Sequence, residues 1–227
     1  MVSPPEAGAR FHSQYGQDRF VRETFFPNQE TGLFLDIGAD DGVDRNNTLF
    51  FERLGWTGLC VEPSPSRFPA LVRNRRCECL NVAVSATPGE VEFLDITGWG
   101  KGLSGIVKNY DPRHLERIAR ETTDNPATRS KTVVRVPALT LGNLLQARGL
   151  SAIDYCSIDV EGSEGDVLAS VDWSAVRFGV VTIEDNYGEA DVRRVMEAHG
   201  YALAATLGQD LVFSGPDLRV RTSGFRH

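Results

Sequence analysis

The sequence predicts an α/β fold in which helices cover both faces of a mostly parallel β-sheet. Short apolar segments alternate along the chain with segments of helical periodicity, which is the pattern of successive βαβ units. The length of 227 residues suits one domain with a sizeable core. Apolar residues make up 41% and charged residues 24%, which is ordinary globular usage.

Five strands and the helices between them follow in order. Asn46 or Asn47 can cap the first helix, and Gly149 can end the third. The segments 201–206 and 210–214 are joined by a short turn, which predicts an antiparallel pair that closes the sheet. The other strands are expected at 33–37, 57–61, 78–84, 153–158 and 178–183, and the helices at 47–54, 64–75, 140–148, 163–170 and 190–199.

Some parts of the chain depart from this alternation. Residues 97–131 read as an insertion with one helix at 112–122, and an insertion of that size is typical of a lid or a substrate wall. Two flanking strands are expected at 90–95 and 133–137. An N-terminal segment at 1–30 that closes over the ligand and a C-terminal tail at 219–227 complete the single domain of residues 1–227.

Charge and composition exclude several classes of function. A net charge of −7 argues against a nucleic-acid partner, because phosphate backbones attract basic surfaces. No run of about 18 apolar residues predicts a membrane span, and the N-terminus lacks the apolar core of a signal peptide. The four cysteines form neither a disulfide framework nor a metal spacing, so we expect reduced thiols and a cytoplasmic protein. The insertion and the closing edge are surfaces on which a homodimer could form.

The most informative motif follows the first strand. It reads Asp36-Ile-Gly38-Ala-Asp40-Asp41-Gly42, and the second strand ends at Glu62. Parallel sheets bind ligands at the carboxyl ends of their strands, where glycines let the backbone approach closely. The Gly-x-x-x-Gly spacing differs from the dinucleotide fingerprint, and the two aspartates would repel a pyrophosphate but not a cationic sulfonium. Glu62 can accept both hydroxyls of a ribose. The motif therefore predicts an adenosine-bearing cofactor without a pyrophosphate.

Five short motifs, in the same order along the chain, resemble those of the FkbM-type methyltransferases, from about Ser13 to Phe213. They are Ser13-Gln14-Tyr15-Gly16-Gln17-Asp18, the stretch from Phe34 to Gly42, Asn46-Asn47-Thr48, the stretch from Gly55 to Pro63, and the stretch from Ile153 to Gly162. The resemblance implies a Rossmann-like class I methyltransferase fold with a seven-stranded sheet and a closing antiparallel strand at 211–213. It also implies methyl transfer from S-adenosylmethionine to a hydroxyl group.

The same resemblance implies which residues bind the cofactor. The glycine-rich turn is assigned to the methionine end, the end of the second strand to the ribose, and the third strand to the adenine. Residues near the N-terminus and after the turn are expected to close over the cofactor, and Asp159 is expected beside the methyl group. The residues for the methionine end are Asp36, Gly38, Ala39 and Gly42, the residue for the ribose is Glu62, and those for the adenine are Asn81 and Ala83. Those expected to close over the cofactor are Gln14, Tyr15, Gln17 and Thr48.

A second group of acidic residues follows the fourth and fifth strands, which we expect to be neighbours. Methyl transfer needs an acceptor oxygen that is held in line behind the methyl carbon and relieved of its proton. A side-chain base can do this, and the candidates are Asp159, Glu161 and, from the insertion, His114. A divalent cation such as Mg²⁺ can do it instead by lowering the pKa of the acceptor. Its candidate ligands are Asp159, Glu184 and Asp185, and the pair Asp185-Asn186 resembles part of the metal site of catechol-type O-methyltransferases.

We therefore expect an S-adenosylmethionine-dependent O-methyltransferase whose acceptor is a small polar molecule, either a sugar or oligosaccharide or a natural-product intermediate. Trp99 and Tyr110 in the insertion could stack on such an acceptor. Two alternatives stay open. One is a non-catalytic module that binds a nucleoside. The other is a nicotinamide-dependent oxidoreductase or epimerase, which the missing dinucleotide fingerprint disfavours.

Overall fold

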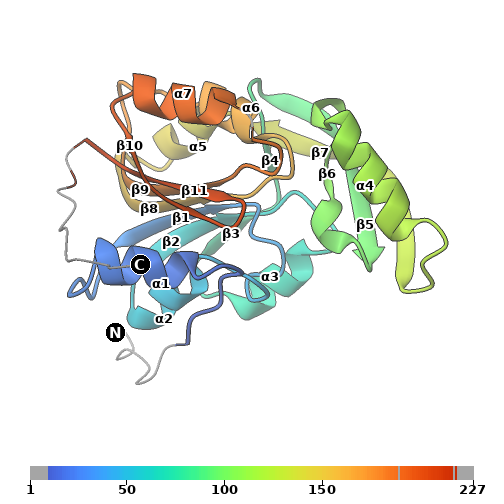
Figure 1. Ribbon diagram of the computed structural model, residues 1–227, viewed down its shortest axis with the longest axis horizontal. Coiled ribbons are helices and arrows are strands. Elements are labelled where there is room, and N and C mark those ends of the chain that lie inside the picture. The colour runs from blue at the N-terminus through green and yellow to red at the C-terminus, as the bar shows by residue number, and fades with distance from the viewer. Residues whose placement is uncertain (1–9, 189, 217, 219–227) are drawn as a thin grey trace.

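The computed structural model describes residues 10–188, 190–216 and 218. Two layers of helices enclose a central β-sheet, and a second, smaller sheet stands beside it (Figure 1). The expected tail at 219–227 and residues 1–9 of the expected N-terminal segment lie outside the described residues.

The central sheet has seven strands in the order β10-β11-β9-β8-β1-β2-β3. All pairs are parallel except those of β11, which is antiparallel to both of its neighbours. This arrangement confirms the predicted Rossmann-like α/β class with an antiparallel closing strand. The strands are β1 (Leu33–Ile37), β2 (Thr57–Val61), β3 (Glu78–Leu80), β8 (Ala152–Ile158), β9 (Arg177–Glu184), β10 (Ala202–Leu207) and β11 (Asp210–Ser214).

Helices cover both faces of this sheet (Figure 1). Successive residues of a strand point to opposite faces, so Phe34 packs with Phe51 of one layer while Leu35 packs with Leu144 of the other. Both faces are therefore apolar, which explains why β1 reads as a continuous apolar run. One layer contains α1 (Gln17–Thr24), α2 (Leu49–Leu54) and α3 (Phe68–Asn74), and the other contains α5 (Leu141–Gln146), α6 (Glu164–Ala169) and α7 (Ala190–Ala198).

Two helices begin later than the sequence predicts. The helix expected from residue 47 begins at Leu49, because the side-chain oxygen of Asn46 accepts the main-chain N–H groups of Thr48 and Leu49 at 3.0 and 2.8 Å. The helix expected from residue 64 begins at Phe68, and the N–H of Ser64 binds a carboxylate that follows β2 instead. In both cases a side chain at the carboxyl end of the sheet competes for the main-chain donors of the first turn.

The strand expected at 78–84 is divided between the two sheets. β3 pairs with β2 as far as Leu80, whereas β4 (Ala83–Val84) pairs with β7 of the second sheet. Between them, the side chain of Asn81 donates to two main-chain oxygens just after β2, at 2.8 and 3.2 Å. The chain leaves the central sheet at this point, so a single long strand was the wrong expectation.

The second sheet, called the accessory sheet below, has the strand order β4-β7-β5-β6. Its main pair is the antiparallel hairpin of β5 (Gly89–Gly98) and β7 (Thr128–Leu139), with the short β6 (Gly105–Ile106) at the edge. The strands expected at 90–95 and 133–137 are thus parts of longer strands. They extend into the segment expected as an insertion, and together they build a sheet rather than a loop.

One helix packs on the accessory sheet. α4 (Pro112–Thr122) lies at the predicted position, and the side chain of Asp111 accepts the N–H of Arg113 at 2.7 Å to cap it. Ile118 of α4 is buried against Ile96 of β5. Two 3₁₀ turns, η1 (Lys101–Leu103) and η2 (Val107–Asn109), connect β5 to α4 around β6.

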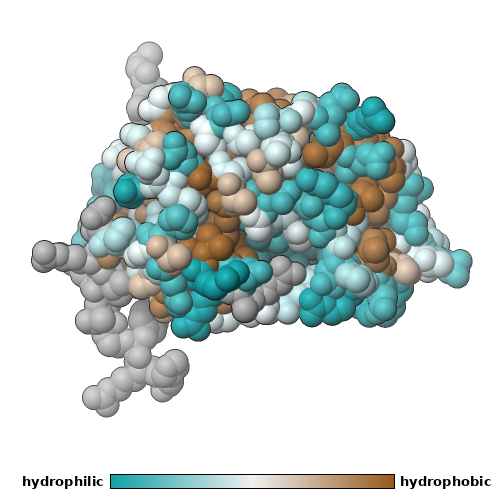
Figure 2. Space-filling view, turned by 90° about the horizontal axis from the view of Figure 1, so that it is seen from above, coloured by the Kyte–Doolittle hydropathy of each residue, from teal (hydrophilic) through white to brown (hydrophobic). Residues whose placement is uncertain are grey.

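Hydrophilic residues cover most of the face seen in Figure 2, with apolar residues in small groups between them. Among the residues that the structure describes, no helix is both long and apolar enough to cross a membrane. All four cysteines are free thiols, and Cys60 and Cys156 are buried in the central sheet.

Candidate active site

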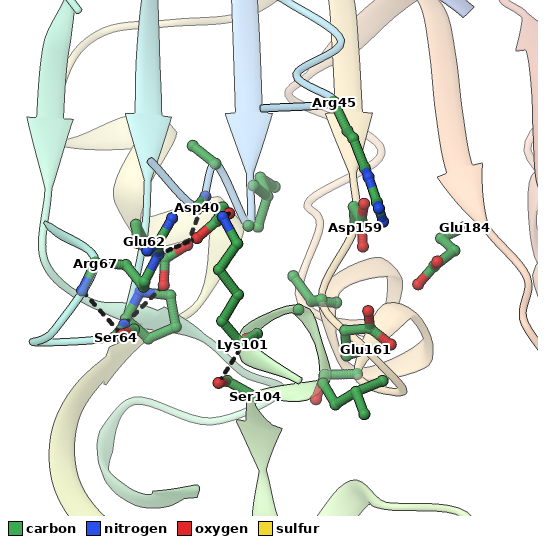
Figure 3. A pocket seen from close by; sticks show the side chains of 18 of the residues that line it. Asp40, Arg45, Glu62, Ser64, Arg67, Lys101, Ser104, Asp159, Glu161 and Glu184 are labelled. Atoms are coloured by element: carbon green, nitrogen blue, oxygen red, sulfur yellow. Dashed lines mark hydrogen bonds and ion pairs between the residues drawn. The ribbon is translucent and has the colours of Figure 1, made fainter. Parts of the chain in front are cut away.

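A pocket of about 550 Å³ opens at the carboxyl ends of β1, β2, β8 and β9, and the accessory sheet forms its opposite wall. The strand order reverses between β1 and β8, which is where doubly wound sheets bind ligands. Glu62 stands in one half of the pocket and three carboxylates stand in the other, with Lys101 between them (Figure 3).

The glycine-rich turn after β1 owes its shape to close packing. Gly38 has φ 87°, and a Cβ at this position would lie 1.7 Å from the main-chain oxygen of Asp159. Its N–H and that of Ala39 both bind the oxygen of Val61, at 2.9 and 3.1 Å. Gly38 and Ala39 line the pocket, as predicted. Gly42 lies outside the pocket wall, where its missing side chain makes room for Arg75.

Glu62, which follows β2, is oriented by two main-chain donors. Its Oε2 accepts the N–H of Asp40 and its Oε1 accepts the N–H of Ser64, both at 2.8 Å. The carboxylate lines the pocket, and burial raises its pKa to about 8. A rigid carboxylate with lone pairs left over suits two adjacent hydroxyl groups, such as those of a ribose.

A buried cation holds the elements below this turn together. The side chain of Arg75 is fully buried and pairs with Glu52 and, at 3.6 Å, with Asp36. It also donates to Asn46 Oδ1 and Thr48 Oγ1, each at 3.0 Å. Burial of two carboxylates is tolerated here because the guanidinium and these hydrogen bonds compensate their lost hydration.

Thr48 and Asp36, two predicted cofactor residues, bind this buried network rather than face the pocket freely. Thr48 is fully buried and donates its hydroxyl to Asp36 at 2.7 Å, so it supports the turn from behind. Asp36 borders the pocket, but one of its oxygens is occupied by Thr48 and Asn46. Burial raises the pKa of Asp36, against the opposing effect of Arg75.

The two aspartates of the turn are paired with cations. Arg67 binds Asp40 and lies 2.9 Å from Asp41. The accessory sheet, α4 and the two 3₁₀ turns are together called the accessory unit below. Its Lys101 lies 3.2 Å from Asp40, 3.7 Å from Asp41 and 3.4 Å from Asp44. These ion pairs weaken the argument that free carboxylates exclude a pyrophosphate here. The glycine spacing still differs from the dinucleotide fingerprint. The ion pairs also join the accessory unit to the glycine-rich turn.

The remaining predicted cofactor residues divide between the pocket and its surroundings. Gln14 and Ala83 line the pocket. Gln17 binds Asp210 and accepts the N–H of Tyr15 at 2.8 Å, so this pair fixes the N-terminal segment to β11 outside the pocket wall. Asn81 donates to the main chain after β2 and does not line the pocket, so it does not face a ligand directly.

Three carboxylates, called the carboxylate cluster below, meet across the pocket from Glu62. Oxygens of Asp159, Glu161 and Glu184 lie within 4.8 Å of one another. Asp159 is accessible from the pocket, yet the surrounding protein displaces much of its water and raises its pKa to about 7. Burial and the neighbouring carboxylates raise the pKa values of Glu161 and Glu184 well above the ordinary range. Oε2 of Glu184 is buried without a hydrogen bond.

The cluster differs from the predicted metal ligands in one member. Glu161 completes the group, whereas Asp185 does not belong to it and its main-chain N–H binds Gln209 at 2.8 Å. Glu161 has φ 53°, a left-handed conformation that costs a non-glycine residue about 1–2 kcal/mol. Asn186 holds the strained residue by donating to its Oε2 at 3.2 Å. The strain turns this carboxylate toward the other two.

His114 stands behind Glu161 rather than in the pocket, so it cannot touch an acceptor as predicted. Its side chain is fully buried, and its Nδ1 lies 3.7 Å from Oε2 of Glu161. The ring stacks on Tyr110, and its Nδ1 and Nε2 lie 3.1 Å from the Tyr187 hydroxyl and 3.2 Å from the Leu103 carbonyl. Tyr110 is buried in the same stack, so it offers no open face to a ligand.

Several charged residues that sequence reasoning missed also line the pocket. Arg45 points toward Asp159 (Figure 3), and Arg117 and Glu121 come from α4. The spacing of Arg117 and Glu121, one helical turn apart, could have placed them on one face of the predicted helix. Arg45 carried no comparable signal, because it lies in an irregular segment with φ 54°.

The strand order, with a pocket at the carboxyl ends of the parallel strands, is that of a Rossmann-like class I methyltransferase fold. A family model described as "Methyltransferase FkbM domain" matches residues 36–203. The chain therefore belongs to the FkbM methyltransferase family, which implies S-adenosylmethionine as the methyl donor. This membership counts against a nicotinamide-dependent oxidoreductase or epimerase.

Several similar proteins carry the names of methyltransferases. A 31-O-demethyl-FK506 methyltransferase from Streptomyces tacrolimicus is 26% identical, over 94% of this chain and 92% of its own length. A 2-O-methyltransferase, NoeI, from Sinorhizobium fredii is 28% identical over 60% of this chain and 56% of its own. A solved TehB-like SAM-dependent methyltransferase from Corynebacterium glutamicum is 11% identical, covers 88% of both chains and has a TM-score of 0.43.

Replacing Arg75 should destabilise the protein strongly. Arg75→Met leaves Asp36 and Glu52 buried without their cation, so we expect a loss of about 3–5 kcal/mol in the free energy of unfolding. Urea denaturation measures this loss. Arg73→Met, at an exposed position of α3 two residues before Arg75, should stay within about 0.5 kcal/mol of the wild type. Equal effects of the two substitutions would contradict the role given to Arg75.

Binding of the cofactor product should release a proton through Glu62. Hydroxyl groups that donate to the carboxylate favour its charged form, so binding should lower the pKa from about 8, and a proton leaves near pH 7. Calorimetry with S-adenosylhomocysteine, in two buffers of different ionisation enthalpy, measures the released proton. Glu62→Gln should abolish this contribution and weaken binding by about tenfold or more. Identical proton release in both proteins would show that Glu62 does not titrate on binding.

Proposed function

We propose that this protein transfers the methyl group of S-adenosylmethionine to a hydroxyl of a small polar acceptor, a sugar or oligosaccharide or a natural-product intermediate. The observation that carries the proposal is the placement of the carboxylate cluster opposite Glu62 in one pocket. The names of the two relatives, which describe a 31-O-demethyl substrate and a 2-O-methyltransferase, support a hydroxyl acceptor. The free thiols suit a reducing compartment, so cytoplasmic location is part of the proposal.

The residues of the pocket fit this methyl donor. Glu62 would accept the ribose hydroxyls, and Gly38 and Ala39 of the turn line the same pocket. Ala83 and its neighbours offer an apolar wall for the adenine. When bound, S-adenosylmethionine supplies an electrophilic methyl group on a positively charged sulfur, which the acidic half of the pocket would favour.

The carboxylate cluster would accept the proton of the acceptor hydroxyl. S-adenosylmethionine would supply the methyl group and leave as S-adenosylhomocysteine, while the proton of the acceptor hydroxyl would pass to a carboxylate of the cluster. Glu161 is the best candidate, because its strained backbone and the hydrogen bond from Asn186 fix its position at the pocket wall. Neighbouring negative charges make the carboxylate a stronger base than in water. His114 would support Glu161 from behind.

A divalent cation is the second route that this cluster supports. Asp159, Glu161 and Glu184 would be its ligands, and the unpaired buried oxygen of Glu184 is the observation that favours it. Hard cations such as Mg²⁺ bind carboxylate oxygens and could hold the acceptor oxygen as well. The cation would lower the pKa of the acceptor hydroxyl, whereas a side-chain base would accept its proton.

Transfer activity distinguishes an enzyme from a non-catalytic nucleoside-binding module. With methyl-labelled S-adenosylmethionine and a panel of glycosides and hydroxylated natural products, we expect labelled ethers and release of S-adenosylhomocysteine. Glu161→Gln should lower kcat by about 10²–10⁴-fold, with cofactor affinity preserved. Glu90→Gln, at an exposed position of β5, is the matched control. Cofactor binding without turnover on any acceptor would favour the module.

Chelation separates the two routes of activation. If a cation is required, exhaustive EDTA treatment should abolish turnover and Mg²⁺ should restore it. Mg²⁺ should also raise the unfolding temperature of the wild type but not of Glu184→Gln. Unchanged turnover after chelation would remove the cation and leave Glu161 as the base.

A further inference from the structure

Trp99 is placed unusually for a tryptophan. Its side chain is 56% exposed although it lines the pocket, whereas Trp56 is buried in the core and Trp173 packs on Phe178. The exposed ring belongs to the turn between β5 and η1, on the wall that the accessory sheet contributes. A large apolar face inside a polar pocket is a surface for a ligand.

The main chain around Trp99 is held firmly. Its N–H donates to the oxygen of Ala127 at 2.8 Å, and its oxygen accepts the hydroxyl of Thr128 at 3.1 Å. The glycines on both sides have φ near 80° and pack so tightly that a Cβ would clash with β7 and α4. The ring is therefore presented from a rigid turn, which reduces the entropy lost when a ligand binds.

Polar groups continue this wall toward the carboxylate cluster. Arg117 and Glu121 line the pocket one turn apart on α4, with Arg117 Nε 3.1 Å from Glu121 Oε1 and each side chain about one third exposed. Thr122, which follows Glu121, packs against Gly100 beside Trp99. At the other end, the charge of Arg117 acts on Glu161. The wall thus runs from an aromatic face, through an ion pair, to the proposed base.

We propose that Trp99 stacks on the apolar face of a pyranose ring while Arg117 and Glu121 bind hydroxyls at its edge. A pyranose has a C–H face that packs on an indole and a rim of hydroxyls that both donate and accept. Arg117 supplies donors and Glu121 supplies acceptors, and charged partners make the stronger hydrogen bonds. A flat aromatic acceptor would leave the ion pair without a role, and a linear polyol would leave the ring face unused. This inference rests on the proposed function and narrows its acceptor to a saccharide.

Direct binding tests the inference without requiring turnover. In saturation-transfer NMR with S-adenosylhomocysteine present, methyl glycosides of glucose, galactose, mannose and fucose are offered to the wild type, with sorbitol as the linear control. We expect at least one pyranoside to bind, with its ring C–H protons saturated most strongly, and sorbitol not to bind. Trp99→Ala should weaken that binding by tenfold or more, and Trp99→Phe by less. Binding of none of the four pyranosides, or equal binding by Trp99→Ala, would overturn the inference.

Kinetics and a matched control separate this result from the proposed function. Val133→Ala removes a side chain of similar exposure from the same sheet outside the pocket wall, and it should bind pyranosides as the wild type does. With the bound pyranoside as acceptor, Trp99→Ala should raise KM tenfold or more and leave the affinity for S-adenosylhomocysteine unchanged. An unchanged KM would overturn the role of Trp99. A wild type that binds no S-adenosylmethionine would instead overturn the proposed function itself.

Discussion

The guanidinium of Arg75 is the point on which the cofactor half of the structure depends. It comes from the residue after α3, yet it pairs with a carboxylate of β1 and another of α2, and it binds the segment that joins them. Three elements that are separate in the sequence therefore meet at one buried cation. Because a buried charge is costly without its partners, this network has one favourable arrangement, and it fixes the turn from which the pocket is built.

The accessory unit is attached to this turn by charge as well. Lys101 reaches across the pocket to the two aspartates of the turn and to Asp44 just after it. On the far side, His114 of α4 lies against Glu161, and the charge of Arg117 acts on the same carboxylate. Ion pairs thus join the two walls of the pocket at the Lys101 end, and the charge of Arg117 acts on Glu161 at the other end. The apolar contacts of α4 with β5 give the wall its own small core, so its shape does not depend on a ligand.

The fold was largely predictable from the sequence, and the site only in part. Apolar runs identify β1, β2, β8 and β9 because both faces of the sheet are buried, and the acid predicted at the end of β2, Glu62, lines the pocket. Strands at 90–95 and 133–137 were predicted, but their pairing into an accessory sheet was not, because they pair across a long gap in the chain. The roles of Thr48, Gly42 and His114 depend on a buried partner far away in the sequence, and no local pattern reports such a partner. Glu161 was predicted as a candidate base of this acidic group, but its left-handed backbone, which periodicity cannot show, was not predicted.

The chain enters and leaves the accessory unit at adjacent points. Ala83 and Val84 of β4 pair with Ala138 and Leu139 at the end of β7, so the intervening segment returns to the place from which it departed. An insertion whose two ends are adjacent can gain or lose residues without altering the path of the central sheet. The central sheet and its glycine-rich turn can then stay constant while the accessory unit, which forms the opposite wall of the pocket, is exchanged. Exchanging the segment from β5 to β7 between related enzymes would be a direct way to change their acceptor specificity.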